Sequence, residues 1–152
     1  MPRLSALEYG LKLLGYRART EKELRERLTG KKYEPEEIDL VLAKLAKIGF
    51  IDDQKFAENY VRDKLSISRR GPRRIYFELI QRGVAKEIAD QATKAIEKDE
   101  ELATAESLLQ SRQRQWAKLE PLAKKRRAIG LLARRGFSPD LIMKLLKTID
   151  KS

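Results

Sequence analysis

Residues 75–96 read IYFELIQRGVAKEIADQATKAI, and residues 128–149 repeat their pattern 53 positions later as AIGLLARRGFSPDLIMKLLKTI. A fainter copy begins at Leu24, which lies 51 positions before Ile75. The matching positions in the two stronger copies are Ile75, Leu79, Arg82, Gly83 and Val84 against Ala128, Leu132, Arg135, Gly136 and Phe137. Repeats of this length form arrays in which each unit packs mainly on its neighbours. The chain is therefore expected to present an extended surface.

Prolines, glycines and capping residues divide the chain into helices. Four prolines lie where a first helical turn accepts them: Pro35, Pro72, Pro121 and Pro139. Five glycines that follow apolar helical runs are predicted to end helices in the left-handed conformation: Gly15, Gly30, Gly49, Gly83 and Gly136. The predicted N-terminal caps are Thr20 with Glu23, Asp52 or Asp53, and Ser138. Alternation with a period of two is nowhere sustained, so no strands are expected.

These signals predict about nine helices, near residues 3–15, 20–29, 35–48, 53–66, 72–82, 85–97, 101–116, 121–135 and 139–149. The predicted fold is all-α, an elongated array of three tandem three-helix repeats with helix-turn-helix-like units, over residues 1–52, 53–100 and 101–152. The acidic stretch 97–101 lacks apolar anchors and is the expected joint between the second and third repeats.

Composition limits the classes of function. No run approaches the roughly 18 apolar residues of a membrane span, so no membrane association is expected. The chain has no cysteine, which permits an intracellular location, and we expect a cytoplasmic monomer. Histidine is also absent, which removes the usual general base and most transition-metal ligands. The segment 29–32 resembles the end of a phosphate-binding loop but lacks its first glycine and its hydroxyl residue. We expect no enzyme, cofactor or metal.

The net charge of +11 is concentrated toward the C-terminus. Residues 1–53 carry 11 basic and 10 acidic side chains, residues 54–100 carry 11 and 8, and residues 101–152 carry 12 and 5. Between Arg112 and Arg135, nine lysines and arginines accompany the single acidic residue Glu120. A segment with charges of one sign indicates a polyanionic partner, most often nucleic acid.

Two basic groups are candidate contacts with DNA or with an acidic protein. One surrounds the predicted helix start at Gly71-Pro72 and consists of Arg69, Arg70, Arg73 and Arg74, where guanidinium groups near a helix N-terminus suit phosphate. The alternative is a solvated loop in which Arg74 pairs with Glu78. The other group consists of Lys124, Lys125, Arg126, Arg127, Arg134 and Arg135. If Leu122, Ile129, Leu132 and Ala133 form the buried side of that helix, then Lys124, Arg127 and Arg134 share an outer face.

Trp116 lies within the basic stretch and has two interpretations. It could stack on a base, as aromatic side chains do in positively charged single-strand grooves. A single tryptophan near a helix end more often packs between helices, and we favour packing. Phe56 and Tyr60 have core-facing spacing, and Leu13, Leu14, Leu40 and Met143 are expected only to pack.

Residues 49–84 resemble the RecX family. The resemblance rests on Gly49-Phe50-Ile51-Asp52-Asp53, Phe56-Ala57, Tyr60-Val61, Gly71-Pro72-Arg73-Arg74-Ile75, Glu78-Leu79 and Gly83-Val84. The segment Leu131–Phe137 and the pattern Thr20–Leu24 also resemble that family, and the similarity extends over roughly residues 5–149. One departure is that Arg69-Arg70 precedes Gly71-Pro72 here, where the family usually has a glycine and an aromatic residue.

This resemblance implies a non-enzymatic regulator of the bacterial recombinase RecA. Such a protein would lie in the groove of the RecA–single-stranded-DNA filament, bridge its subunits, and inhibit its ATPase, strand exchange and growth. The basic face would contact single- and double-stranded DNA.

Two other classes of function remain open on the residues alone. The first is a stand-alone nucleic-acid-binding protein that contacts DNA without sequence specificity, because trihelical units with basic helices also describe helix-turn-helix modules. Residues 85–97 are nearly charge-balanced and residues 139–149 offer only two lysines, which argues against base-specific readout. The second is a structural adaptor, which the C-terminal excess of positive charge disfavours.

Overall fold

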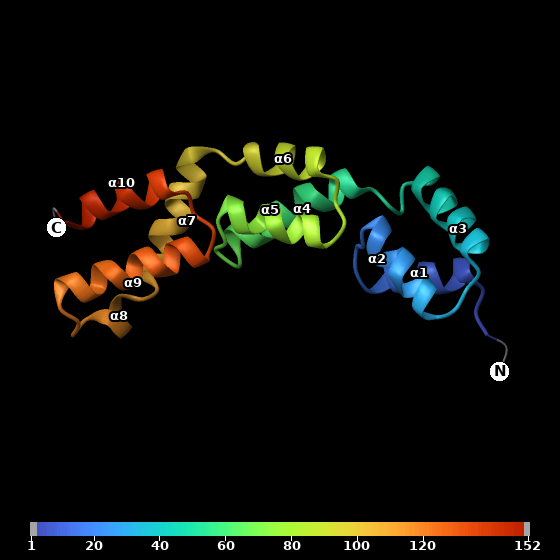
Figure 1. The fold of residues 1–152 in the computed structure, drawn as a ribbon, viewed down its shortest axis with the longest axis horizontal. Helices are drawn as coiled ribbons and strands as arrows, with labels where there is room; N and C mark the ends of the chain where they lie inside the picture. Colours follow the sequence, from blue (N-terminus) through green and yellow to red (C-terminus); the bar gives the residue numbers. More distant parts are fainter. Residues whose placement is uncertain (1–2, 151–152) are drawn as a thin grey trace.

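A computed structural model describes residues 3–150, with side chains as far as Thr148, and all regular structure in this range is α-helical (Figure 1). The helices are α1 (Ala6–Tyr16), α2 (Glu21–Gly30), α3 (Pro35–Lys47), α4 (Asp53–Ser66), α5 (Pro72–Gln81), α6 (Lys86–Lys94), α7 (Lys98–Gln110), α8 (Gln113–Trp116), α9 (Pro121–Arg134) and α10 (Pro139–Asp150). The prediction of an all-α array is confirmed.

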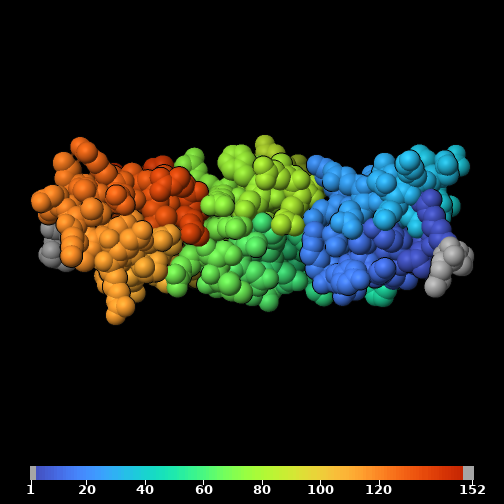
Figure 2. Space-filling view, turned by 90° about the horizontal axis from the view of Figure 1, so that it is seen from below, coloured from blue at the N-terminus to red at the C-terminus, as the bar shows by residue number. Residues whose placement is uncertain are grey.

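Three separate hydrophobic cores follow one another along the molecule. The first is built on Leu24, Leu28 and Leu45 from α1–α3, the second on Ile75 and Leu79 from α4–α6, and the third on Leu132 and Phe137 from α7–α10. The termini lie at opposite ends of the molecule (Figure 1). In the space-filling view the three parts form consecutive blocks along the long axis (Figure 2). We call them the first, second and third units.

The seventh predicted helix, 101–116, is wrong in its bounds. Helix α7 ends at Gln110, and α8 is a separate short helix. The Ser111 hydroxyl donates to the carbonyl of Leu108, an alternative to helical pairing that favours termination. The acidic joint predicted at 97–101 is also shorter than expected, because Glu97 and Glu100 form a capping box that starts α7.

Most of the predicted helix ends are confirmed. Pro35, Pro72, Pro121 and Pro139 each open a helix, and Gly49, Gly83 and Gly136 have φ of 84°, 94° and 93°. Thr20 and Glu23 form the predicted capping box, while Asp52 and Ser138 accept backbone N–H groups at the starts of α4 and α10.

Gly15 and Gly30 do not have the predicted left-handed conformation. Both lie inside their helices, α1 and α2, and Lys32 takes the positive φ of 64° in place of Gly30. Asp53 also differs, because its carboxylate accepts the backbone N–H of Glu21 in the first unit at 3.1 Å. One of the two predicted caps of α4 thus links two units.

The units are joined through the ends of their middle helices, α2, α5 and α9. At the first joint, the Thr20 hydroxyl at the start of α2 donates to the carbonyl of Arg82 at the end of α5. At the second joint, the Gly71 N–H at the start of α5 donates to the carbonyl of Arg135 at the end of α9, at 2.6 Å. Each contact matches an N–H-rich helix end with a carbonyl-rich one. The three middle helices are consequently stacked head to tail, in the order opposite to the sequence.

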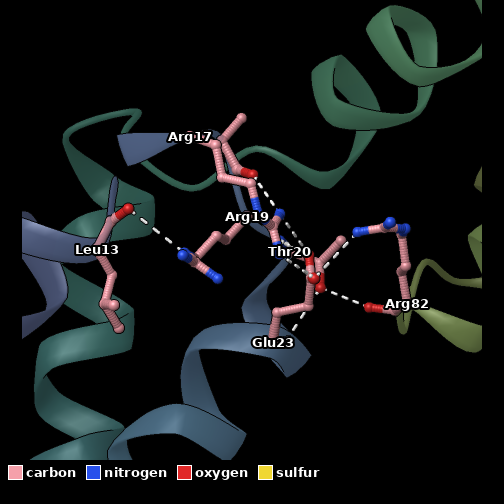
Figure 3. Close-up of polar contacts among 7 residues, drawn as sticks. Leu13, Arg17, Arg19, Thr20, Glu23 and Arg82 are labelled. Carbon is pink, nitrogen blue, oxygen red and sulfur yellow. Dashed lines mark hydrogen bonds and ion pairs between the residues drawn. The ribbon is translucent and has the colours of Figure 1, made fainter. Parts of the chain in front are cut away.

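Glu23 is the centre of the first joint (Figure 3). Its Oε2 lies 2.8 Å from Arg17 Nη2 and 3.2 Å from Arg82 Nη1, so that one carboxylate binds guanidinium groups from both units. Its Oε1 accepts the backbone N–H of Thr20, which is fully buried. Burial would raise the pKa of Glu23, but the hydrogen bonds from Arg17 and Thr20 and the two positive charges together hold this pKa below its ordinary value.

Glycine at positions 71, 83 and 136 allows the units to approach closely. A Cβ on Gly83 would overlap the side chain of Lys22 across the first joint, and a Cβ on Gly136 would overlap the backbone of Arg74 across the second. A Cβ on Gly71 would overlap the backbone of Gly136. By contrast, Gly49 has the same positive φ but open space around it.

We predict that Gly136→Ala destabilises the protein more than Gly49→Ala does. The left-handed backbone alone should lower the free energy of unfolding by about 1 kcal/mol at each position. The overlap with Arg74 should add a loss of roughly 1–3 kcal/mol at position 136. Gly83→Ala should likewise lower the free energy of unfolding more than Gly49→Ala does. Urea unfolding followed by circular dichroism measures these differences. Equal losses at positions 49 and 136 would show that the second joint is not closely packed.

Replacing Glu23 by glutamine should weaken the first joint in a pH-dependent manner. A carboxylate whose pKa is lowered by folding stabilises the native state above its unfolded pKa of about 4.3, and loses this effect as the pH falls through the folded value. Glu23→Gln should therefore lower the free energy of unfolding by about 1–2 kcal/mol at pH 7, and the difference should narrow below about pH 4. Glu26→Gln, in an exposed pair with Lys22, is the control and should change stability by less than about 0.5 kcal/mol. A difference for Glu23→Gln that stays constant down to pH 3 would contradict this account.

Candidate filament and nucleic-acid interface

The second joint brings together the corresponding helix ends, but with different hydrogen-bond donors and a different set of charges. Gly71 occupies the position of Thr20, so the start of α5 has no side-chain cap. The N–H groups of Gly71 and Arg73 donate instead to the carbonyls of Arg135 and Gly136. Arg74 occupies the position of Glu23. The carboxylate that neutralises the first joint is thus replaced by a cation at the second.

Arginines converge on Arg135 at this joint. Burial, followed by the positive charges of Arg74, Arg112, Arg70 and Arg69, lowers the pKa of Arg135 from its ordinary value. Arg135 Nη1 donates to the carbonyl of Ser68 at 2.8 Å, which holds the guanidinium between the second and third units. Four residues distant in sequence from Arg135 are therefore close enough to repel it.

One carboxylate partly offsets these charges. Glu78 Oε2 lies 2.7 Å from Arg70 Nη1 and 3.8 Å from Arg74 Nε, which confirms the pairing of Arg74 with Glu78 that the spacing suggested. The other carboxylate oxygen, Oε1, is buried without a hydrogen-bond partner. Within the described part of the chain, no ion pair involves Arg69, Arg73, Arg134 or Arg135. The joint consequently retains a large uncompensated positive charge.

A second group of arginines adjoins the first along α9. An open groove of about 530 Å³ is lined by Arg112, Gln115, Trp116, Arg126, Arg127 and Arg134, among others. Arg112 belongs to both groups, because it lies near Arg135 and also lines this groove. We define the arginine band as Arg69, Arg70, Arg73, Arg74, Arg112, Arg126, Arg127, Arg134 and Arg135. It begins at the joint between the second and third units and extends along α9 to Arg126 and Arg127.

The predicted buried side of α9 is wrong apart from Leu132. The buried residues are Ala128, Leu131 and Leu132, whereas Leu122, Ile129 and Ala133 are exposed. This rotation also separates the lysines from the arginines. Lys124 and Lys125 are half-buried beside a different groove, and the predicted outer face shared by Lys124, Arg127 and Arg134 does not form. The error arose because exposed apolar residues were assigned to the core.

Trp116 packs against the third core and also lines the grooves on both sides of it. Its half-buried position accords with packing between helices, and stacking on a base stays a prediction. Phe56 is buried in the second core and the half-buried Tyr60 packs against it, as their spacing suggested; Leu79 is buried in the same core.

Three residues at the second joint were not predicted as site residues from the sequence. Arg112 enters the arginine band because the chain turns between α7 and α8. Phe77 and Met143 are 65% and 59% exposed, so the expectation that Met143 packs in the core is wrong. The repeat could have indicated that Phe77 is exposed, because the matching residue of the first unit is the charged Glu26.

The described residues contain neither a cluster of metal ligands nor a membrane-spanning helix. Over residues 3–150, no three acidic side chains cluster in a way that could hold a metal ion. In the same range, none of the helices has the length and apolarity needed to cross a bilayer. The arginine band and its adjoining grooves are thus the main candidate interface.

Comparison with known proteins places each unit in one family. Models of the first, second and third three-helix domains of RecX match residues 6–45, 52–92 and 99–146, respectively. A regulatory protein RecX from Mycobacterium sp. (strain JLS) is 38% identical over 140 residues, which cover 89% of this chain and 76% of the relative. Another from Amycolatopsis mediterranei (strain U-32) is 31% identical over 142 residues, covering 93% and 81%.

Solved structures agree in fold. The crystal structure of RecX from Lactobacillus salivarius superposes with a TM-score of 0.86 at 24% sequence identity, over 97% of this chain and 96% of that one. A second RecX crystal structure gives 0.85, also at 24% identity, over 93% and 71%. With all three domain models matched in order and close relatives over most of its length, the chain belongs to the RecX family of regulatory proteins.

Proposed function

We propose that this protein is a non-enzymatic regulator that binds the RecA–single-stranded-DNA filament in its groove. It inhibits the ATPase, strand exchange and filament growth of the recombinase. It acts as a monomer in the cytoplasm, through three units spanning residues 1–52, 53–100 and 101–152.

The observation that carries the proposal is the arginine band on an elongated three-unit array. A filament wrapped on DNA presents phosphates and protein surfaces that recur along an axis, and an extended ligand can contact several of them. The stacked middle helices α2, α5 and α9 have 10, 10 and 14 residues, about 50 Å of helix at about 1.5 Å per residue. Cationic side chains at one joint favour binding to such a polyanion.

Non-specific binding to bare DNA is the alternative function. The same arginine band would serve it, because contacts with phosphates carry no sequence information. The two functions differ in whether the protein surfaces of the recombinase contribute to affinity.

The proposed function predicts that the protein lowers the single-strand-dependent ATPase of a bacterial RecA when present at well below one molecule per recombinase subunit. One regulator would contact several subunits, so substoichiometric amounts suffice. The ATPase is measured during titration at fixed salt, with filament mass followed by light scattering. An unchanged ATPase, combined with salt-sensitive binding to bare DNA, would contradict filament regulation and support the alternative.

Reversing the charge of Arg126, Arg127 and Arg134 to glutamate should weaken binding to DNA-loaded filaments at least tenfold. These side chains are exposed, so the far-ultraviolet circular dichroism of the variant should be unchanged. The matched control reverses three exposed lysines outside the band, Lys12, Lys47 and Lys94, and should weaken binding less than threefold. Equal losses in both variants would show that net charge, rather than the arginine band, governs binding.

The affinity for bare single strands should fall linearly in log–log plots against salt, with a slope of about −0.7 for each phosphate contacted. The triple reversal of Arg126, Arg127 and Arg134 should make this slope shallower. Fluorescence anisotropy of labelled poly(dT) at several salt concentrations measures it. A wild-type affinity that does not change with salt, which is a slope of zero, would exclude phosphate contacts.

A further inference from the structure

An apolar groove lies beside the arginine band at the second joint. It has a volume of about 740 Å³ and is formed by α5, α9 and α10. Three of its lining side chains are largely or partly exposed: Phe77 at 65%, Met143 at 59% and Ile129 at 40%. Exposed apolar side chains gathered in one concavity mark interaction sites more often than isolated ones do.

The rim of this groove is basic. Arg73, Arg74 and Arg134 line it together with Glu78, and Glu78 Oε2 already accepts Arg70 and approaches Arg74. Arginine, aromatic residues and methionine are the residue types enriched in the cores of protein interfaces. The groove combines all three within one surface.

The first joint shows that the fold does not require these residues. The positions that match Arg74, Phe77 and Met143 there are Glu23, Glu26 and Asp90. Glu26 is exposed and pairs with Lys22, so a carboxylate is accommodated at the position of Phe77. At these three positions the two joints therefore differ, with carboxylates at the first and an arginine and two apolar side chains at the second. The difference is not needed for stacking of the units.

We infer that this groove docks an acidic segment of a protein partner, with one large apolar side chain on Phe77, Ile129 and Met143 and carboxylates paired with Arg73, Arg74 and Arg134. A carboxylate at the rim gains charge-assisted hydrogen bonds with guanidinium groups. An aliphatic or aromatic side chain gains from the apolar floor, whereas the sugar–phosphate backbone of DNA has no comparable group. The charge and apolarity together therefore fit a protein segment better than a nucleic acid.

The test transplants the residues of the first joint into the second. Phe77→Glu combined with Met143→Asp copies Glu26 and Asp90, and the matched control is Tyr16→Glu with Leu40→Asp. The control residues are 72% and 74% exposed in the first unit, so both variants exchange exposed apolar side chains for the same two acids. Circular dichroism and urea unfolding check that each variant folds.

Binding is measured by anisotropy of N-terminally fluorescein-labelled protein against two probes, RecA filaments assembled on poly(dT) and bare poly(dT). We expect the groove variant to bind filaments at least tenfold more weakly than the control variant. Phe77→Ala/Met143→Ala, which adds no charge beside the arginines, should bind bare poly(dT) within twofold of the wild type. The uncharged variant Phe77→Ala/Met143→Ala should weaken filament binding about fivefold. Comparing the two variants separates the affinity lost by removing the apolar side chains from the affinity lost by adding negative charge.

The inference rests on the proposed function, since the filament is the probe, and the outcomes separate the two. If the wild type binds filaments and the groove variant binds them equally well, the groove inference is overturned and the proposed function stands. If the uncharged variant Phe77→Ala/Met143→Ala loses affinity for bare poly(dT) as strongly as for filaments, the groove binds nucleic acid instead. If the wild type does not bind filaments at all, the proposed function fails, and this partner fails with it.

Discussion

Hydrogen bonds between helix ends determine how the three units are placed. The first amides and last carbonyls of an α-helix have no partner within the helix. At the second joint two amides at the start of α5 donate to carbonyls at the end of α9, and at the first joint the Thr20 hydroxyl donates to the Arg82 carbonyl at the end of α5. The opposed partial charges of the two ends favour the same arrangement. The acceptor is a backbone carbonyl at both joints, while the donor is a side-chain hydroxyl at the first and backbone amides at the second, so the side chains around the two joints can differ. At the first joint, Glu23 pairs with arginines of both units. At the second joint, Arg74 of the arginine band occupies the position of Glu23.

The position of the arginine band follows from this freedom. The guanidinium groups that repel one another around Arg135 come from α5, from the segment before it, and from the segments after α7 and α9. Their mutual repulsion opposes stacking, while the Gly71–Arg135 and Arg73–Gly136 hydrogen bonds favour it. An anionic partner would relieve the repulsion without breaking those bonds. Binding at this joint is therefore physically coupled to the attachment of the third unit.

The sequence was sufficient for the fold because its signals are local. Prolines at helix starts, the capping box at Thr20 and glycine at 83 and 136 each define a helix end within a few residues, and the repeat period then gives the array. The site was harder to predict. The face of α9 that enters the core depends on how the helix rotates against α7 and α10, and the apolar residues Leu122 and Ile129 gave the wrong rotation. The convergence of Arg112 on Arg135 likewise required the turn at Ser111, which has no strong sequence signal.

The C-terminus of α2 differs from those of α5 and α9 at the residue that takes the left-handed conformation. Lys32 matches Gly83 and Gly136 in the repeat and has the same left-handed backbone, with φ of 64°. The neighbouring amide makes the same bond, from Tyr33 N–H to the Leu28 carbonyl, as those of Val84 and Phe137 in the other units. At both joints the space beside this residue is filled by the next helix, which only glycine permits. A lysine side chain at this position would overlap a helix start placed as at the two joints, so the end of α2 differs from the ends of α5 and α9 in the one residue that decides whether a helix fits against it.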